Sequence, residues 1–430
     1  MRKLARNTWF LVLALIAIAM LTSMLVLALF EPPLDYEITQ TPQATLESEE
    51  FLQVLQVLAD AQLYRKTKID VLTNGDAYFP AELEAIRNAK ESVNLEAYIF
   101  SEGTVTGRFI ETLTERAKAG VRVNMVLDAI GSLRTSAGFL RPLTDAKGHV
   151  EFYHPLRWYT WPRYNNRTHR ELLIVDGRIG FAGGSGFADH WLHGDDGKPP
   201  WRDTMFRVEG DAVAGLQSSF VENWVEASGQ ILTGKEYFPF EPPMGDIVCL
   251  VINSSPSAGR STRARMIFQT LLASARKSIH INTPYFLPDD SVRKEMGRAV
   301  KERGVDLRII VPGRHSDHTI TRRSSRALYG DILEAGGEIY EYQPSMMHAK
   351  IMIIDGLWSI VGTTNFDNRS FGLNDEVNIA AKDRQFAARL EQDFQNDLRK
   401  SRRISYQEWQ RRPLWERIQE KAGGLIERQQ

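Results

Sequence analysis

The sequence has little cysteine and no surplus of charge of either sign. Its one cysteine, Cys249, stands alone among 430 residues, so no disulfide can form within the chain. The 53 basic and 54 acidic side chains leave a net charge of −1, whereas proteins that bind nucleic acid typically carry a marked basic excess. This balance argues against nucleic acid as a partner. With 43% hydrophobic and 25% charged residues, the composition is that of a globular protein of two to three domains.

Spacing typical of a metal site is also scarce. The one candidate is a cluster of imidazoles and carboxylates at His190, His193, Asp195 and Asp196, which are residue types that bind zinc. The letters GKPP follow the cluster, and glycine with proline is typical of a loop. We therefore interpret the cluster as a loop, and we expect neither a metal ion nor another cofactor.

An uncharged stretch of 22 residues, Trp9–Phe30, lies near the N-terminus. As a helix it would be about 33 Å long, enough to cross the hydrocarbon core of a bilayer. Basic residues precede it and acidic residues follow it, namely Arg2, Lys3, Arg6, Glu31, Asp35 and Glu37. The positive-inside rule then predicts a single-pass protein of the inner, cytoplasmic membrane with the rest of the chain on the extracytoplasmic side. A cleaved signal peptide is the alternative, but the stretch continues for eleven residues beyond Ala17-x-Ala19, too far for an ordinary h-region.

After a polar tether the chain alternates between strand-like and helical segments. Strands are predicted at Val93–Phe100, Val121–Leu127, Leu172–Val175 and Ile179–Ala182, and helices at Phe51–Leu63, Pro80–Ala89 and Gly107–Ala119. Alternation of this kind is typical of β-α-β units. We therefore expect an α/β fold with a mixed sheet flanked by helices.

The second half of the chain repeats the first, block by block and in the same order. NAKESVNLEAYIF corresponds to SARKSIHINTPYF, AGVRVNMVLD to RGVDLRIIVP, GHVEFY to GEIYEY, and THRELLIVDG to MHAKIMIIDG. A repeat of this length indicates a duplicated domain rather than a solenoid. The predicted division is an anchor at 1–30, a tether at 31–65, a first lobe at 66–234, a linker at 235–246, a second lobe at 247–400 and a basic amphipathic tail at 401–430.

The second copy contains a polar motif on a strand-like segment. His348, Lys350 and Asp355 form H-x-K-x-x-x-x-D, and the residues between Lys350 and Asp355 are all apolar. On a strand His348 and Lys350 point to one face, where an imidazole beside an ammonium suits anion binding together with proton or nucleophile chemistry. Asn365 follows in a small-residue turn, and Glu376 lies in a later strand-like segment. Chance gives on the order of 0.02 such three-residue matches in this chain.

These residues resemble the phospholipase D superfamily, in which HxKxxxxD followed by G-[GST]-x-N occurs in two copies. The surrounding sequence looks most like the bacterial cardiolipin synthase branch of that superfamily. The similar segments include INTPYFLPDD and YEYQPSMMHAKIMIIDGLWSIVGTTNFDNRSFGLNDEVN, and the resemblance covers residues 70 to 415. It implies two phospholipase D-type lobes whose motifs meet in one site. It also implies that one histidine attacks phosphorus while the other protonates the leaving alkoxide and then deprotonates the incoming alcohol or water.

Carried onto this sequence, the family pattern is complete only in the second copy. There it implies catalytic roles for His348, Lys350, Asp355 and Glu376, with Lys350 and Asn365 binding the substrate phosphate and Glu376 as the partner of His348. In the first copy His169 and Asp176 match, and Asp203 takes the place of the carboxylate that orients His169. The lysine position, however, is Glu171, and the asparagine position is Gly186.

Glu171 puts a carboxylate where the family has an ammonium. Two unit charges 4 Å apart interact by roughly 4 kcal/mol at an effective dielectric constant of 20, so this exchange matters. Glu171 turns away or pairs with Arg167 or Arg163, or it is protonated and carries a proton with a raised pKa, or the first half-site is degraded and the protein is a pseudoenzyme. The sequence leaves these three alternatives open, and Glu171 and Gly186 are treated as modulators of the site.

The function implied is that of a membrane-anchored phosphatidyltransferase that passes a phosphatidyl group through a phosphohistidine to an alcohol. The expected substrate is an anionic phospholipid, with phosphatidylglycerol first, and the expected setting is the membrane. Two alternatives from the same superfamily are a phospholipase D-type hydrolase and a nuclease, and a catalytically degraded lipid- or protein-binding module is a third. Three further segments suit a membrane surface: the aromatic loop Arg157–Tyr164, the basic cluster between Arg314 and Arg326, and the stretch Arg399–Arg428. The oligomeric state is not predicted.

Overall fold

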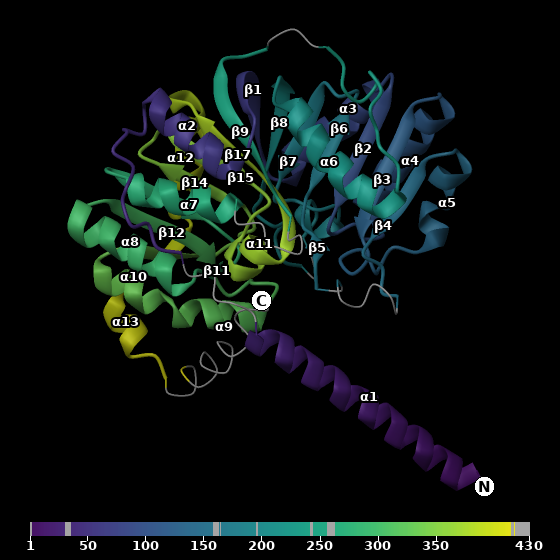
Figure 1. Ribbon diagram of the computed structural model, residues 1–430, viewed down its shortest axis with the longest axis horizontal. Coiled ribbons are helices and arrows are strands. Elements are labelled where there is room, and N and C mark those ends of the chain that lie inside the picture. Colours follow the sequence, from purple (N-terminus) through teal and green to yellow (C-terminus); the bar gives the residue numbers. More distant parts are fainter. Residues whose placement is uncertain are drawn as a thin grey trace.

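Two lobes stand side by side in the computed structural model, and one helix extends away from them (Figure 1). The structure describes residues 2–30, 36–157, 163, 165–194, 197–240, 244–255, 263–413 and 417. The extended helix is α1 (Arg2–Phe30), in which side chains are described from Trp9 to Ser23. A search of the helices over their described residues finds none that is both long and apolar enough to span a membrane.

The first lobe alternates strands and helices much as predicted. Its elements are β1 (Leu63–Thr73), α3 (Gly75–Asn88), β2 (Ser92–Ala97), α4 (Thr104–Lys118), β3 (Arg122–Asp128), α5 (Ala137–Asp145), β4 (His149–Tyr153), β5 (Arg167–Thr168), β6 (Leu172–Val175), β7 (Ile179–Gly183), β8 (Thr204–Gly210) and α6 (Val213–Ser228), with a 3₁₀ turn at Asp189–Trp191. The six boundaries predicted for β3, β6 and β7 agree with the structure to within one residue. Gly120, after α4, has a φ of +90°, a conformation that glycine adopts without steric cost.

The second lobe repeats this plan and adds short elements at its sheet ends. Its elements are β9 (Ile247–Ser254), α7 (Arg263–Ser274), β10 (Ser278–Asn282), β11 (Phe286–Leu287), α8 (Asp290–Arg303), β12 (Asp306–Pro312), α9 (Thr319–Ala327), α10 (Tyr329–Ala335), β13 (Glu338–Tyr342), β14 (Ile351–Ile354), β15 (Trp358–Gly362), β16 (Phe366–Asp367), α11 (Asn368–Gly372), β17 (Asn374–Lys382), α12 (Arg384–Leu398), β18 (Ser401–Ile404) and α13 (Tyr406–Gln410). The equivalence of β2-α4-β3 with β10-α8-β12 confirms the duplication.

One mixed sheet runs through both lobes. Its strand order is β18-β13-β12-β10-β14-β15-β17-β9-β1-β8-β7-β6-β2-β3-β4. In each lobe three strands are parallel, β2-β3-β4 and β10-β12-β13, and the strands toward the centre are antiparallel. The lobes join where β9 pairs antiparallel with both β1 and β17. The predicted mixed sheet flanked by helices is therefore confirmed, with the addition that the two sheets are continuous.

An apolar core is shared between the lobes. Leu172 and Ile174 of β6 and Leu216 and Phe220 of α6 belong to the same buried cluster as Ile351 of β14. Apolar burial is worth about 25 cal/mol per Å², so separating the lobes would expose this cluster at a large cost in free energy. The relative position of the lobes, and of any site between them, is therefore fixed by packing.

The segment predicted as a tether is part of the second lobe over much of its length. Helix α2 (Glu49–Ala59) starts at the N-cap Ser48 and buries Phe51, Leu52 and Leu55 in the core of that lobe. Leu46 also accepts a 2.8 Å hydrogen bond from the Trp358 indole. The prediction of a free tether at 31–65 is wrong here, because apolar residues at helical spacing bury one face of α2.

The predicted tail also begins inside the fold. Strand β18 pairs antiparallel with β13 at the edge of the sheet, and Trp409 of α13 packs against the second core. Residues 414–416 and 418–430, including Trp415, lie outside the described residues, as do Asp195, Asp196 and 158–162 of the aromatic loop. The second lobe therefore extends to Gln410 rather than ending at 400.

Replacing Phe51 by alanine tests whether α2 is a structural part of the lobe. The Phe51 ring is fully buried and meets the Trp358 ring edge-on at 6.1 Å. We expect Phe51→Ala to lower the free energy of unfolding by about 3–5 kcal/mol, measured by urea denaturation of the full chain. Val57→Ala is the matched control, because Val57 lies on the same helix and is 79% exposed. If both substitutions had equally small effects on the free energy of unfolding, α2 would not be a structural part of the lobe and the prediction of a tether would hold.

Candidate active site

A cavity of about 310 Å³ lies between the lobes and is lined by both of them. The lining residues are Tyr98, Ile99, His169, Glu171, Trp191, Tyr285, Asp317, His318, Thr321, His348, Asn365, Asp367, Arg369, Ser370 and Asn374. The structure thus brings both motif histidines, Glu171 and Asn365 to one space, although the two histidines are far apart in the sequence. The predicted meeting of the two motifs is confirmed.

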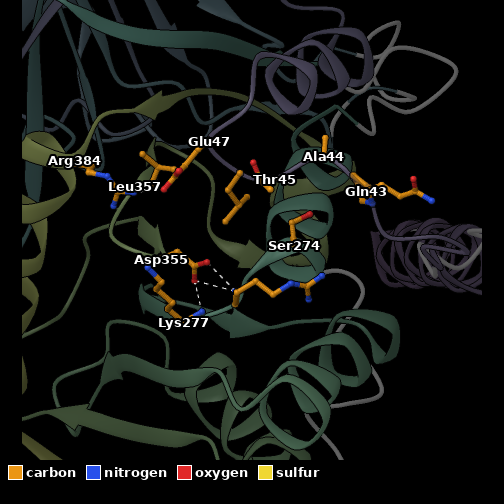
Figure 2. Close-up of a pocket in the computed structure, with 12 residues that line it drawn as sticks. Gln43, Ala44, Thr45, Glu47, Ser274, Lys277, Asp355, Leu357 and Arg384 are labelled. Carbon is orange, nitrogen blue, oxygen red and sulfur yellow. Dashed lines mark hydrogen bonds and ion pairs between the residues drawn. The ribbon is translucent and has the colours of Figure 1, made fainter.

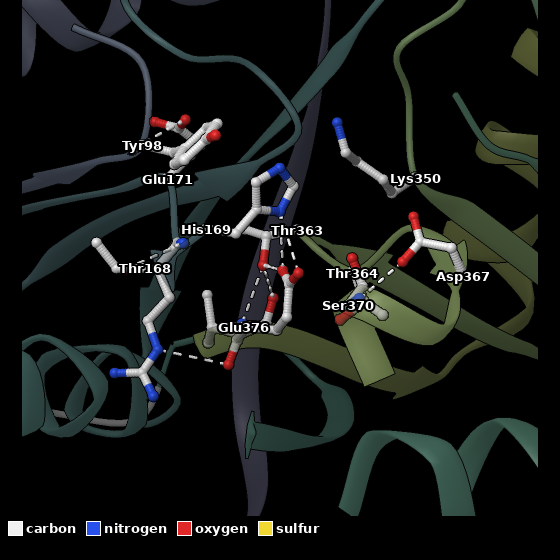
Figure 3. A network of polar contacts seen from close by, with 12 residues as sticks. Tyr98, Thr168, His169, Glu171, Lys350, Thr363, Thr364, Asp367, Ser370 and Glu376 are labelled. Carbon is white, nitrogen blue, oxygen red and sulfur yellow. Dashed lines mark hydrogen bonds and ion pairs between the residues drawn. The ribbon is translucent and has the colours of Figure 1, made fainter. Parts of the chain in front are cut away.

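Each histidine is held by a carboxylate that belongs to the other lobe. The Nδ1 atom of His169 lies 3.1 Å from both carboxylate oxygens of Glu376 (Figure 3). The Nδ1 atom of His348 lies 2.7 Å from Oδ2 of Asp203. The sequence-based assignment, in which Asp203 orients His169 and Glu376 partners His348, is therefore wrong. The partners are exchanged.

The exchange follows from backbone pairing between the lobes. Strand β5, directly before His169, runs parallel to the start of β17, and the His169 amide donates a 2.9 Å bond to the carbonyl of Asp375. On the other side, the His348 amide donates a 2.7 Å bond to the carbonyl of Arg202. Because each histidine follows a segment paired with the opposite carboxylate strand, its ring reaches the carboxylate across the interface.

The second half-site contains the cation that the motif predicts. The Lys350 ammonium lies 2.8 Å from Nδ1 and 3.2 Å from Nε2 of His348, and it donates to the carbonyls of His348 and Gly184. Lys350 therefore stands behind His348 rather than on the cavity wall. Asn365 does line the cavity, and its buried Oδ1 atom has no hydrogen-bond partner among the described residues.

Burial and charge set the protonation of this half-site. Burial lowers the pKa of the His348 imidazole, and the neighbouring Lys350 charge lowers it further, against the opposing effect of Asp203. Burial would raise the pKa of Asp203, but the charges of Lys350 and His348 outweigh it and hold that pKa below its usual value. Burial also lowers the pKa of Lys350. The carboxylate is thus ionised and the imidazole neutral near pH 7.

Among the described residues Glu171 forms no ion pair with an arginine, so the first of the three sequence-based alternatives is wrong in that respect. Arg167 lies 3.4 Å from Asp128, and Arg163 pairs with Glu226. Glu171 stays at the cavity, where Oε1 accepts the N–H groups of Tyr98 and Ile99. Burial raises the pKa of Glu171 well above its usual value, against the opposing effects of those two amides and Lys350.

A polar network supports His169 from behind. The Thr168 hydroxyl donates to Oε1 of Glu96, and the Asn223 amide donates to the same oxygen at 2.6 Å. Burial raises the pKa of Glu96 to about 7. Arg170, fully buried, donates to the backbone carbonyl of Glu376. These groups fix the backbone that carries His169, which sequence reasoning did not foresee.

The two motif aspartates are not in the cavity, contrary to the prediction of a catalytic role. Oδ1 of Asp355 accepts the amides of Lys277 and Ser278, and the carboxylate also accepts the amide of Arg276, beside a second, separate cavity (Figure 2). Asp176 accepts three amides in the same way at the start of β2. Both aspartates have a φ of +54° and precede a glycine, the Asp-Gly pattern of tight hairpin turns.

The structure adds cavity residues that the sequence did not reveal. Tyr98 and Tyr285 follow the equivalent strands β2 and β10, and the Tyr98 ring lies edge-on to His169 at 5.3 Å. The only sequence feature that could have indicated these tyrosines was their position near the ends of the repeated blocks.

Asp367 is buried, which raises its pKa to about 6. Within the basic cluster, His318 lines the cavity, whereas Arg322 and Arg326 form ion pairs with the buried Glu341. Among the described residues no group of acids, histidines or cysteine could hold a metal ion.

The fold and the paired histidines define a two-lobed phospholipase D-like protein. The structure resembles that of phosphatidylserine synthase from Haemophilus influenzae, with a TM-score of 0.67 and 13% sequence identity over 89% of this chain and all of that one. It also resembles polyphosphate kinase from Porphyromonas gingivalis, with a TM-score of 0.53 and 12% identity over 89% of this chain and 55% of that one. At these identities the similarity concerns the fold.

Sequence comparison identifies the family. Residues 83–194 and 268–398 match the family described as cardiolipin synthase, PLD-like domain. The chain is 33% identical to the major cardiolipin synthase ClsA of Bacillus subtilis over 387 residues, which cover 89% of this chain and 80% of that protein. It is 34% identical to a cardiolipin synthase of Geobacillus over 87% of this chain and 75% of that protein. The chain belongs to the cardiolipin synthase family.

Removing the Asp355 carboxylate tests its structural role. Because Asp355→Ala removes the charged acceptor of three backbone amides, of which the Ser278 amide is partly buried, we expect it to lower the free energy of unfolding by about 1–3 kcal/mol, measured by urea denaturation. Asp145→Ala on α5 is the control, since the Asp145 side chain is 70% exposed and its exposed ion pair is worth about 0–1 kcal/mol. An Asp355→Ala protein with unchanged stability would contradict this assignment.

Proposed function

We propose that this protein is a phosphatidyltransferase of cardiolipin synthase type with phosphatidylglycerol as donor and acceptor. The observation that carries the proposal is the pair of cavity histidines whose Nδ1 atoms each face a buried carboxylate. A carboxylate accepts, so Nδ1 carries the proton and Nε2 of a neutral ring is left with a lone pair. Such an imidazole attacks phosphorus or accepts a proton.

The reaction divides into two displacements at phosphorus. One histidine attacks the phosphodiester through Nε2, forming the N–P bond as the bond to the leaving glycerol oxygen breaks. The second histidine, protonated, gives its proton to that oxygen. It then takes the proton of the incoming hydroxyl, whose oxygen displaces the first histidine and forms the new phosphodiester. Water in place of that hydroxyl would give hydrolysis.

The groups around the histidines suit the charge that develops on the phosphoryl oxygens. Lys350 supplies positive charge from behind His348, and Asn365 lines the cavity with an amide group that can donate through Nδ2. Asp203 and Glu376 stabilise the imidazolium that forms on the histidine each one contacts. Each carboxylate thus acts on the histidine of the other lobe, whereas Lys350 acts on the histidine of its own lobe.

Helix α1 is the membrane anchor in this proposal. Its described apolar side chains face solvent rather than protein, with Leu11, Leu13 and Leu15 all more than 60% exposed, and exposed apolar surface of this extent marks a membrane or partner contact. In Figure 1 the lobe end of α1 lies on the side of the molecule where α9 is drawn, and α9 carries the cavity residue Thr321. The cavity would then lie near the bilayer surface, on the extracytoplasmic side.

Histidine and carboxylate variants test the chemistry and the exchanged partners together. With labelled phosphatidylglycerol in vesicles, His169→Ala and His348→Ala should form no cardiolipin. Asp203→Asn and Glu376→Gln should lower kcat by about 10²–10⁴-fold, because the histidine tautomer is no longer fixed. In reactions quenched with alkaline detergent, which preserves the acid-labile N–P bond, the covalent phosphoenzyme should be absent in one histidine variant. It should also be reduced in the variant of the carboxylate that contacts that histidine from the other lobe.

Three other results would contradict the proposal. If Asp203→Asn reproduced the His169→Ala pattern, the exchange of partners would not operate in catalysis. Phosphatidic acid as the main product would identify a hydrolase. A folded wild-type protein that is inert toward phospholipids and DNA would identify a binding module. Asp145→Ala serves as the control for unspecific effects of losing a carboxylate.

Cysteine labelling tests the anchor and its orientation. The native Cys249 is fully buried, so labelling with a membrane-impermeant maleimide has little background. We expect Gln40→Cys to react in spheroplasts and Thr8→Cys to react only after lysis, because the positive-inside rule puts the basic N-terminus in the cytoplasm. Labelling of Thr8→Cys in intact spheroplasts, or recovery of the protein in the soluble fraction, would contradict the anchor.

A further inference from the structure

Glu171 presents an unused polar atom in the first half-site. Its side chain is 4% exposed, and Oε1 accepts hydrogen bonds from Tyr98 at 3.2 Å and Ile99 at 3.4 Å. The other oxygen, Oε2, is buried and has no hydrogen-bond partner among the described residues. Glu171 also lines the cavity with both histidines. A buried polar atom without a partner costs about 1–3 kcal/mol, so a ligand that supplies one is favoured.

The two departures from the family motif, Glu171 and Gly186, lie next to each other in the structure. A Cβ atom at Gly186 would lie 3.1 Å from Oε1 of Glu171 and 2.9 Å from the carbonyl of Ile99. A side chain at that position would therefore crowd both the Glu171 carboxyl group and the Ile99 carbonyl. In the second lobe Asn365 occupies the equivalent position and Lys350 the equivalent of Glu171. The first lobe has thus replaced a lysine–asparagine pair with a single carboxyl group and a glycine.

Two features of this pocket match a protonated carboxyl group. Such a group has one acceptor and one donor oxygen; Oε1 has two N–H partners, and Oε2 has none. The charge balance agrees, since Asp203 and Glu376 already place two carboxylates against the histidines. Burial, as described above, raises the pKa of Glu171 well above its usual value, which favours the protonated form.

We propose that Glu171 is a neutral carboxylic acid whose Oε2–H donates a hydrogen bond to a non-bridging oxygen of the substrate phosphodiester, in the place that a lysine fills elsewhere in the family. This proposal rests on the proposed function. A phosphodiester carries one negative charge, which Lys350 matches, so the first half-site needs a donor rather than a second cation. An ionised Glu171 would instead repel the substrate.

The sign of the pH dependence follows directly. Below its raised pKa, Glu171 carries the proton and binds the phosphoryl oxygen, and as pH rises through that pKa the donor is lost. The groups that face Glu171 are Tyr98 beyond β2, His169 before β6, Asp203 before β8, and His348 and Lys350 before β14. Lys350 and Tyr98 also titrate on the alkaline side, so only the difference between matched variants isolates Glu171.

The test compares full-length wild type, Glu171→Gln and Glu171→Ala in phosphatidylglycerol vesicles across pH. Glutamine keeps one acceptor and one donor, so E171Q should retain kcat/KM within about threefold at pH 7 and should lose the part of the alkaline decline that Glu171 causes. E171A should lose kcat/KM about ten- to a hundredfold, since one hydrogen bond to a charged group is removed. An E171Q protein as inactive as E171A, or one with the wild-type pH profile, would overturn the proposal.

A double-mutant cycle tests the link with Gly186. Gly186→Asn should lower kcat/KM more in wild type than in the E171A background, because E171A removes the contact with Oε1 while the contact with the Ile99 carbonyl remains. Equal effects in both backgrounds would show that Gly186 acts independently of Glu171. Urea denaturation of each variant confirms that the folded protein is being compared.

One further measurement separates this proposal from the proposed function. The C=O stretch of a protonated carboxyl group is visible in the infrared difference spectrum between wild type and E171Q, whether or not the protein makes cardiolipin. If that band is present and cardiolipin is not formed, the proposed function fails and the protonation of Glu171 stands. If cardiolipin is formed and the band is absent at neutral pH, only the assignment of Glu171 fails.

Discussion

The site depends on two short stretches of backbone pairing between the lobes. The His169 amide donates to the Asp375 carbonyl, and the His348 amide donates to the Arg202 carbonyl. Each bond ties a histidine to the strand of the other lobe, one residue before the carboxylate that orients its ring. Neither lobe could therefore form a complete histidine–carboxylate pair alone. The continuous sheet through β1 and β9 and the shared apolar core hold this arrangement in place.

Within that frame the two half-sites have different electrostatic characters. The second has an ammonium, Lys350, beside a histidine whose Nδ1 faces an ionised Asp203. The first has no cation at the equivalent position, where a buried carboxyl group faces the amides of Tyr98 and Ile99. The two duplicated lobes can differ in this way because one phosphodiester carries one negative charge. The Lys350 ammonium balances that charge, so the other half-site can bind the phosphodiester through neutral hydrogen-bond donors.

Much of the fold could be predicted from the sequence, and less of the site. Boundaries of β3, β6 and β7 came from runs of apolar residues, which report burial directly. The motif aspartates were predicted to be catalytic, although Asp176 and Asp355 each accept hydrogen bonds from three backbone amides. The sequence does not distinguish an aspartate in that structural role from one that orients a histidine. A helix was predicted near α2, but its packing on the second lobe was not, because its partners, Trp358 above all, lie far away in the sequence.

The sequence by itself determined the duplication, the α/β character of each lobe and the identity of the paired histidines, because these follow from local periodicity and from motifs within one segment. Only the tertiary structure decided which carboxylate serves which histidine and where Glu171 and its neighbours lie. Those outcomes depend on contacts between residues about two hundred positions apart, such as Asp203 with His348 and Glu376 with His169. They also depend on the room left by Gly186, which no local pattern encodes.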